Sequence, residues 1–237
     1  MDNNNSSNVG AVKGLASGYI CCAPISATVP TDAGTPLPAA FVNLGYASED
    51  GVTNEIETDT EDTKDWNGTT LATIQTSRSE TFVFKLLETK TDVLKEVFGD
   101  DNVTVDATTG VITVKSNSNE KPYKVYTIET ELSDNRLQRV VIPRGKSVLE
   151  SEIVYSAGEA VGYELKINCS PDANGDTAKR IIERFEKYAT RTDFPATGET
   201  GKLYIDIATG KRYRWSNSAY EELTAPTTLK EIKKRKK

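Results

Sequence analysis

The chain has 237 residues, of which 37% are hydrophobic, which suits one large domain or one domain with a small appendage. Its formal net charge is −6, and it contains no histidine, which excludes Ser-His-Asp and Cys-His catalysis and a histidine zinc site. The three cysteines, Cys21, Cys22 and Cys169, have neither CxxC spacing nor the pattern of a disulfide framework, so we expect free thiols. We identify no secretory signal and no membrane-length apolar run, and therefore expect synthesis in the cytoplasm and no membrane partner.

The first part of the chain is polar and irregular. Residues 1–8 read MDNNNSSN, and the proline-containing stretch 29–38, VPTDAGTPLP, has no helical or strand periodicity. We predict an extended N-terminal arm over residues 1–40. An ordered arm of this length often lies on a neighbouring subunit, and a flexible tail is the alternative.

Strand patterns begin at residue 41. FVNLGYA (41–47) is followed by an acidic segment, which we predict to be a long loop over 48–68 that includes a turn at Asn67-Gly68. TTLATIQTS (69–77) and ETFVFKLLE (80–88) are predicted to form a hairpin. A short helix is expected at 91–98.

This helix would begin with Thr91 as its N-cap and end at Gly99. Its apolar stripe would cover one side of a sheet. The stripe consists of Val93, Leu94, Val97 and Phe98.

Three more hairpins follow. They are predicted within 103–115, between 123–132 and 136–143, and between 148–156 and 160–169. Strands at this spacing predict a mainly β protein, an antiparallel β-sandwich over residues 41–176 with one flanking α-helix.

The C-terminal part is predicted to contain a second helix and a small β-module. The helix and linker would occupy 177–192, the β-module 193–224 and a flexible basic tail 225–237. The helix prediction depends on an apolar stripe at helical spacing. The residues of that stripe are Ile181, Ile182, Phe185 and Tyr188.

The acidic segment EDGVTNEIETDTEDTKDW (49–66) has eight carboxylates and one lysine. It lacks the spacing and the glycine of a calcium-binding EF-hand loop, so a solvated acidic face is favoured. Asp172, Asn174, Asp176 and Glu183 come closer to that spacing, but position 6 is Thr177 and a predicted strand precedes them. A turn followed by a helix N-cap explains them better.

No motif of an enzyme is present. Ser17 lies in GLASGY rather than GxSxG, and there is no phosphate-binding loop or GxGxxG. Nothing in the sequence marks two carboxylates as a buried catalytic pair, so a carboxylate-based hydrolase is the least favoured function. The terminal KKRKK (233–237) suits nucleic acid, an acidic partner or a solubilising role, while the acidic body would repel DNA.

From residue 41 the sequence resembles a known family. FVNLGYASEDGVTNEIETDTEDTKDWNG, TLATIQTSRSETFVFKLLE, DVLKEVFG and RVVIPRGKSVLESEIVYSAGEAVGYELKINCSPDANGD (139–176) are similar, in order and phrasing, to the major tail tube protein of long-tailed, non-contractile, siphovirus-type bacteriophages. The resemblance covers about residues 9–185. It implies a β-sandwich with one flanking helix and a structural, non-enzymatic protein without cofactor or metal.

The resemblance also implies the protein's partners. Subunits would form hexameric rings that stack into a tube, through which genomic DNA passes without specific binding. Tape measure, tail terminator and baseplate proteins would bind the tube, and the location would be the virion, after assembly in the bacterial host cytoplasm.

Residues 1–40 and 48–68 match the two elements that reach neighbouring subunits or rings in that family. The inter-ring candidates are Glu49, Asp50, Glu55, Glu57, Asp59, Glu61, Asp62, Asp65 and Trp66. Whether their carboxylates meet the next ring or face the bore stays open.

A DNA conduit should offer few cations to phosphate. Thr127, Glu129 and Glu131 share one face of a predicted strand and are our lumen-facing candidates, whereas Tyr126 and Ile128 on the other face are expected in the core.

The segment FPATGETGKLYIDIATGKRYRWSNSAYEEL (194–223) resembles a small β-module that occurs as an appendage on phage tail proteins. Its aromatic residues suit either a surface that binds carbohydrate or the core of a small module. They are Tyr204, Tyr213, Trp215 and Tyr220. The alternative function is therefore a glycan-binding surface adhesin.

Overall fold

The computed structural model describes residue 4 and residues 9–16 and 18–226. It is mainly β, as the sequence predicts, and these residues contain one α-helix where two are expected. The chain divides into two compact units that are interleaved along the sequence. Unit 1 contains the described residues up to 43, residues 125–141 and those from 178 onward, and unit 2 contains 44–124 and 142–177.

The sheet of unit 2 is antiparallel. It contains β4 (Ala47–Lys64), β5 (Thr70–Leu86), β10 (Tyr163–Cys169) and the second half of β9 (Arg136–Leu149), in the order β9-β10-β5-β4. Alternation along these strands points one set of side chains into the core. The buried apolar residues of that set are Phe82, Phe84, Leu86, Tyr163, Leu165 and Ile167.

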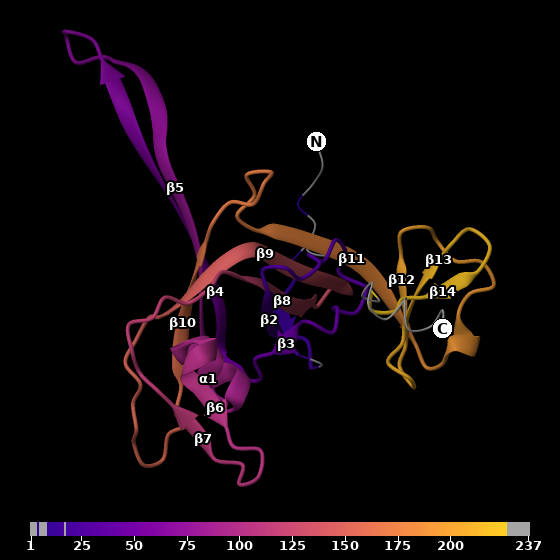
Figure 1. Cartoon of the computed structure of the whole chain (residues 1–237). Coiled ribbons are helices and arrows are strands. Elements are labelled where there is room, and N and C mark those ends of the chain that lie inside the picture. The colour runs from indigo at the N-terminus through magenta and orange to yellow at the C-terminus, as the bar shows by residue number, and fades with distance from the viewer. Residues whose placement is uncertain (1–3, 5–8, 17, 227–237) are drawn as a thin grey trace. The chain divides into compact units, whose positions relative to one another are not determined.

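The helix α1 (Thr91–Phe98) confirms the prediction at 91–98 (Figure 1). Val93, Leu94 and Val97 are buried, and Gly99 ends the helix with φ of +100°. The N-cap, however, is Lys90 rather than Thr91, and no side chain caps the helix there.

A 3-10 helix, η2 (Asp100–Asn102), follows α1, and then the predicted hairpin of β6 (Val103–Val105) and β7 (Ile112–Val114). Its turn is fixed by the Asp106 carboxylate, which accepts hydrogen bonds from the backbone of Thr108 and Thr109.

Two predictions near the acidic segment are wrong. Residues 48–68 are not a loop, because β4 extends to Lys64 and pairs with β5 along most of its length. Residues 69–88 do not form their own hairpin, because β5 is one continuous strand that takes its partner from β4. Ser77-Arg78-Ser79 contains no glycine, proline or asparagine to make the turn, whereas the predicted turn at Asn67-Gly68 is present, with φ of +83° at Gly68.

Unit 1 contains the remaining strands. These are β1 (Val12–Gly14), β2 (Ile20–Pro24), β3 (Val42–Asn43), β8 (Lys124–Leu132), the first half of β9, β11 (Lys179–Tyr188), β12 (Leu203–Asp206), β13 (Arg212–Trp215) and β14 (Tyr220–Glu222). β8 pairs with β1, β2 and β9, and β9 pairs in turn with β11. β12 runs parallel to β11, and β13 and β14 follow as an antiparallel meander.

The described part of residues 1–40 is not a free extended arm. β1 and β2 belong to the sheet of their own subunit, and Ile20 and Ala33 are fully or almost fully buried. The apolar run Ile20–Ala23 supplies a buried strand that the polar surroundings concealed.

The prediction of a second helix within 177–192 is wrong. Residues 179–188 form β11, which is paired with β9 through Ile181 opposite Arg139 and Glu183 opposite Leu137. Ile181, Ile182, Phe185 and Tyr188 fit a helical stripe, but only Phe185 is fully buried, and Ile182 is 47% exposed. Pairing with β9 and burial of Phe185 beside Leu137 and Leu203 outweigh the helical propensity of this segment.

Residues 193–224 contain the expected short strands. A 3-10 helix, η3 (Arg191–Asp193), precedes these strands and ends at the first residue of the range. They lie in the same compact unit as β8 and β11 rather than forming a separate one.

Candidate functional site

β4 and β5 continue beyond the body of unit 2 as a two-stranded arm. β10 pairs with β5 only from Thr81 onward, so residues 70–79 of β5 and 57–64 of β4 have only each other as strand neighbours. Figure 1 shows this hairpin projecting from the part of unit 2 that holds β10 and α1. We call residues 55–79 the β4–β5 arm.

One face of the arm carries a row of carboxylates. Glu55, Glu57, Asp59 and Glu61 alternate along β4 and therefore point to the same side of the ribbon. We call these four the acid row, and all four are exposed. The residues opposite the acid row on β5 are Thr81, Ser79, Ser77 and Ile74, and none of them is a lysine or an arginine. Ser77 donates to Asp59 at 2.6 Å and Ser79 to Glu57 at 3.4 Å.

The other predicted acidic residues have different positions. Asp62 lies on the opposite face and accepts from Thr73 at 2.7 Å. Asp65 closes the turn at the tip, where its carboxylate accepts hydrogen bonds from the backbone of Asn67 and Thr69. Glu49 and Asp50 lie at the start of β4, within an irregularity of its pairing with β5.

Apolar side chains on the arm are exposed to solvent. Trp66 at the tip is 100% exposed, Leu71 67%, Ile74 58% and Ile56 49%. A two-stranded hairpin on its own is at best marginally stable in water, because it has no face on which to bury such groups. The arm therefore has the composition of a segment that packs against another molecule.

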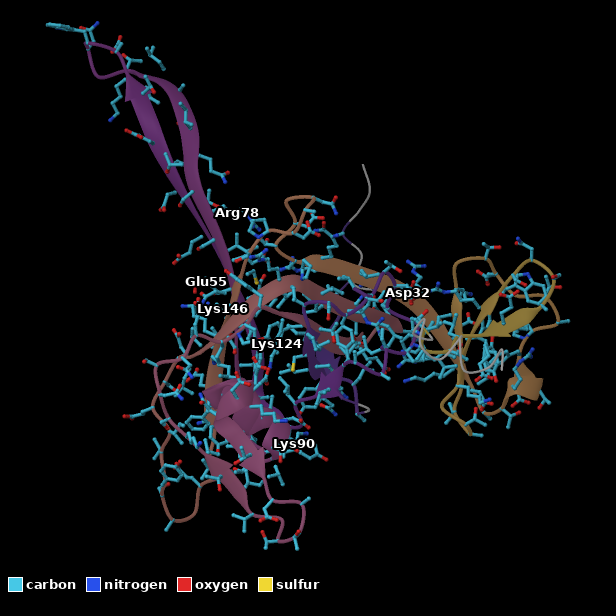
Figure 2. All side chains as sticks on the ribbon, in the orientation of Figure 1. Asp32, Glu55, Arg78, Lys90, Lys124 and Lys146 are labelled. Carbon is cyan, nitrogen blue, oxygen red and sulfur yellow. The ribbon has the colours of Figure 1, made fainter. Side chains whose placement is uncertain are left out.

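The root of the arm is held by a buried carboxylate. Glu80 is 2% exposed and accepts hydrogen bonds from Thr177 Oγ1 at 2.6 Å, Arg78 Nη2 at 3.0 Å and Asn54 Nδ2 at 3.2 Å. Arg78 in turn donates to Thr177 at 2.9 Å, and Figure 2 labels it at the base of the ribbon. Sequence analysis missed this network, because one glutamate on the inward face of a strand carries no signal of its partners.

Thr127 and Glu129 do not face outward, so their assignment to the lumen is wrong for this subunit. Thr127 is fully buried, and Glu129 is 5% exposed. Glu129 forms an ion pair with Arg139 (Nε to Oε1, 2.6 Å), whose guanidinium also donates to the carbonyl oxygens of Asp32 and Thr35. The segment before residue 40 thus covers the face of β8 that was expected to be open.

Glu131 is half-buried and accepts from Lys187 at 2.7 Å. Tyr126 and Ile128 are buried, as predicted for the core.

The aromatic residues of the C-terminal segment form a core rather than a binding face. Tyr204 is 1% and Tyr213 8% exposed, and both pack around Phe194, while Trp215 and Tyr220 pack partly buried against this cluster. The rings meet mainly edge to face, as between Phe194 and Tyr220 at 5.0 Å between centroids.

The calcium alternative finds no support in geometry. The Asp172 carboxylate accepts hydrogen bonds from the backbone of Asn174 and Asp176, as in a turn, and Glu183 binds Arg214 at 2.5 Å. Within the described ranges no group of three or more His, Cys, Asp or Glu side chains is placed to hold a metal ion. The described helices include none with the length and apolar character needed to cross a membrane. The basic run 233–237 lies outside the described residues.

Comparison with known proteins gives the class. The family model described as phage tail tube protein matches residues 1–191, and the chain belongs to that family. It is therefore a structural component of a phage tail, not an enzyme, and its location is the virion. No curated protein matches the sequence.

Among solved structures, the chain is similar to the tube-terminating cap of the anti-feeding prophage. The identity is 13% and the TM-score 0.35, and the alignment covers 66% of this chain and 91% of the cap protein.

Proposed function

We propose that this chain is the subunit of a siphovirus-type tail tube and that it self-assembles into stacked hexameric rings around the path of the DNA. Family membership supports the role in a tube. The observation that carries the assembly proposal is the β4–β5 arm. Trp66 at its tip is completely exposed, and along the arm each strand pairs only with the other.

The arm supports assembly through its edges as well as its side chains. Along the arm, β4 pairs with β5 alone, so each strand keeps one edge of unpaired N–H and C=O groups. Such edges are templates for pairing with another chain, and contacts with neighbouring subunits would cover them. In this proposal residues 48–68, together with the facing part of β5, form the contact between subunits or rings.

The proposed partners are further copies of this chain, with tape measure, terminator and baseplate proteins at the ends or inside. DNA would pass without specific binding. The exposed carboxylates of the acid row support this part of the proposal, because carboxylates that approach the bore would repel DNA phosphates. The described part of residues 1–40 packs on its own subunit, so the arm at β4–β5 is the element assigned to the contact.

The test is assembly of purified protein with and without the arm. Residues 58–78 would be replaced by Asn-Gly, which closes a two-residue hairpin between the remaining strands. The matched control replaces the exposed turn Ala107–Thr109 of the β6–β7 hairpin with Asn-Gly. Negative-stain images and sedimentation velocity should show rings or striated tubes for the wild type and the control, and monomers for the arm deletion. Tubes formed by the arm deletion would overturn the proposal.

A further inference from the structure

The outward face of the unit 2 sheet carries a basic and aromatic patch on β9 and β10, whereas the acid row lies on β4 at the other edge of this sheet. On β9, Arg144 and Lys146 alternate and share this face, and Lys166 on the neighbouring β10 is also on it. Both β9 cations stack on one ring: the Arg144 guanidinium lies 4.3 Å and Lys146 Nζ 5.4 Å from the Tyr123 centroid. We call Tyr123, Arg144, Lys146 and Lys166 the basic patch.

The basic patch and the acid row lie on the same face of one sheet. The pairing register runs from Lys146 to Asn168, then to Thr81 and then to Glu55, so one row of outward side chains joins the two. Figure 2 labels Lys146 and Glu55 in this region of the sheet, where the arm begins. Three strand spacings separate these two residues, which is about 14 Å.

This separation prevents the opposite charges from meeting within one copy. An ion pair needs its atoms within about 4 Å, and both sets of side chains point away from the same pleated surface. The rest of the acid row lies still further along β4. The acid row therefore stays on the arm and the cations of the basic patch stay on β9 and β10, without direct contact between the two sets.

The basic patch is also accessible to a partner. Arg144 is exposed, and no carboxylate forms a salt bridge with it in the part of the chain that the structure describes. Lys146 pairs with Glu120, whose side chain is 83% exposed, and Lys166 with Glu150 at 3.3 Å. Exposed pairs of this kind are worth at most about 1 kcal/mol, so a better set of carboxylates can replace them.

The spacing of the two sets matches. Arg144 and Lys146 are alternate residues of a strand, and so are neighbouring members of the acid row. Alternate residues repeat at about 6.7 Å, so two ion pairs can form at once between two facing strands. Tyr123 holds the Arg144 and Lys146 side chains in place before binding, which lowers the entropy lost on contact.

We propose that the basic patch of one copy binds the acid row of a second copy, head to tail. This inference rests on the proposed function and names the surface that receives the arm. A contact between two different surfaces of one chain leaves a free arm and a free patch on every dimer, so it propagates into rings or filaments.

The experiment uses two charge-reversed variants. The arm variant carries Glu57→Lys and Asp59→Lys, and the patch variant carries Arg144→Glu and Lys146→Glu. Each alone places like charges opposite each other and should lose tube assembly. An equimolar mixture should assemble again. The arm lysines of the arm variant then meet the glutamates of the patch variant, and the unchanged arm of the patch variant meets the unchanged patch of the arm variant.

Matched controls keep the same charge changes on other exposed positions. Glu152→Lys with Glu159→Lys corresponds to the arm variant, and Lys115→Glu with Arg184→Glu corresponds to the patch variant. Both controls should assemble as the wild type does. Circular dichroism melting would confirm that all variants are folded.

The outcomes separate the two proposals. If the wild type never assembles, the proposed function fails and this inference with it. If the wild type assembles and the patch variant assembles equally well, only the head-to-tail pairing is wrong. A mixture that stays monomeric although each variant is folded would also overturn the pairing.

Discussion

Arg139 and Glu129 form a two-point ion pair inside unit 1, with Nε to Oε1 at 2.6 Å and Nη2 to Oε2 at 2.9 Å. The Arg139 side chain is 2% and the Glu129 side chain 6% exposed. The remaining guanidinium donors reach the backbone of Asp32 and Thr35, so the pair fixes the segment before residue 40 as well as β8 and β9. Glu129, a lumen-facing candidate from the sequence, is thus part of the interior of unit 1.

Removal of one member of this pair should be strongly destabilising. Glu129→Gln leaves the Arg139 charge buried without its partner, and we expect a loss of about 3–5 kcal/mol in the free energy of unfolding. Urea denaturation followed by circular dichroism measures it. The control is Lys187→Met, which breaks the more exposed pair with Glu131 and should cost less than about 1 kcal/mol. Equal losses in the two variants would contradict the assignment.

Glu80 should determine how rigidly the β4–β5 arm is attached. Glu80→Ala removes the acceptor shared by Arg78, Asn54 and Thr177, so the root hydrogen bonds are lost together. Hydrogen exchange of backbone amides in residues 55–79 should become faster, with little change in β10. Glu57→Gln, on the exposed part of the arm, is the control and should leave exchange near the root unchanged. Unchanged protection in Glu80→Ala would show that backbone pairing alone holds the arm.

The elements that sequence predicts best here are those whose signal is local. The helix at 91–98 has a compact apolar stripe and a glycine stop, and the turns at Asn67-Gly68 and Asp106–Gly110 contain residues that suit positive φ. β11 has an apolar spacing that suits a helix or a strand, because Ile181 and Phe185, four residues apart, fit both periods. Only pairing with the partner strand β9 decides between them. β1 and β2 were missed for the same reason, since their pairing with β8 spans more than 100 residues of sequence.

In the candidate site, too, sequence predicts the local features and not the contacts between distant strands. Composition places carboxylates in residues 49–66, and the alternation of Glu55, Glu57 and Asp59 already suggests one face. What sequence could not supply is the register that puts Lys146 in the same row as Glu55, because Lys146 comes from a distant strand. Burial of Glu129 likewise depends on Arg139 and on a segment about 100 residues earlier in the chain.

The aromatic cluster of the C-terminal segment should behave as a core. Tyr204→Ala removes a ring that is 1% exposed and a hydroxyl that accepts from the Glu199 backbone N–H at 2.8 Å, so we expect a loss of about 3–5 kcal/mol. Thermal unfolding measures this loss. Tyr155→Ala, at a side chain that is 76% exposed, is the control and should change stability by less than about 0.5 kcal/mol. A glycan array that showed saturable binding abolished by Trp215→Ala would instead revive the adhesin function.

Asp32 should make stability depend on pH in the acid range. Burial raises the pKa of its carboxyl, but hydrogen bonds from the Thr35 backbone N–H and hydroxyl and the charges of Arg214 and Arg139 outweigh this, so the pKa is lowered from 3.8. Because the folded pKa lies below the unfolded one, the stabilisation is fully present above about pH 4. It is lost as the pH falls from there through the folded pKa.

Free energies of unfolding measured between pH 2 and pH 6 therefore test the role of Asp32. Asp32→Asn should be less stable than the wild type above pH 4, and the difference should shrink as the pH falls, because the wild-type carboxyl becomes protonated. Thr35→Val keeps the backbone donor and removes the hydroxyl donor at 2.8 Å, so it should reduce this pH dependence without abolishing it. A difference between wild type and Asp32→Asn that stayed constant down to pH 2 would show that the charge of Asp32 contributes nothing and that its effect is one of packing.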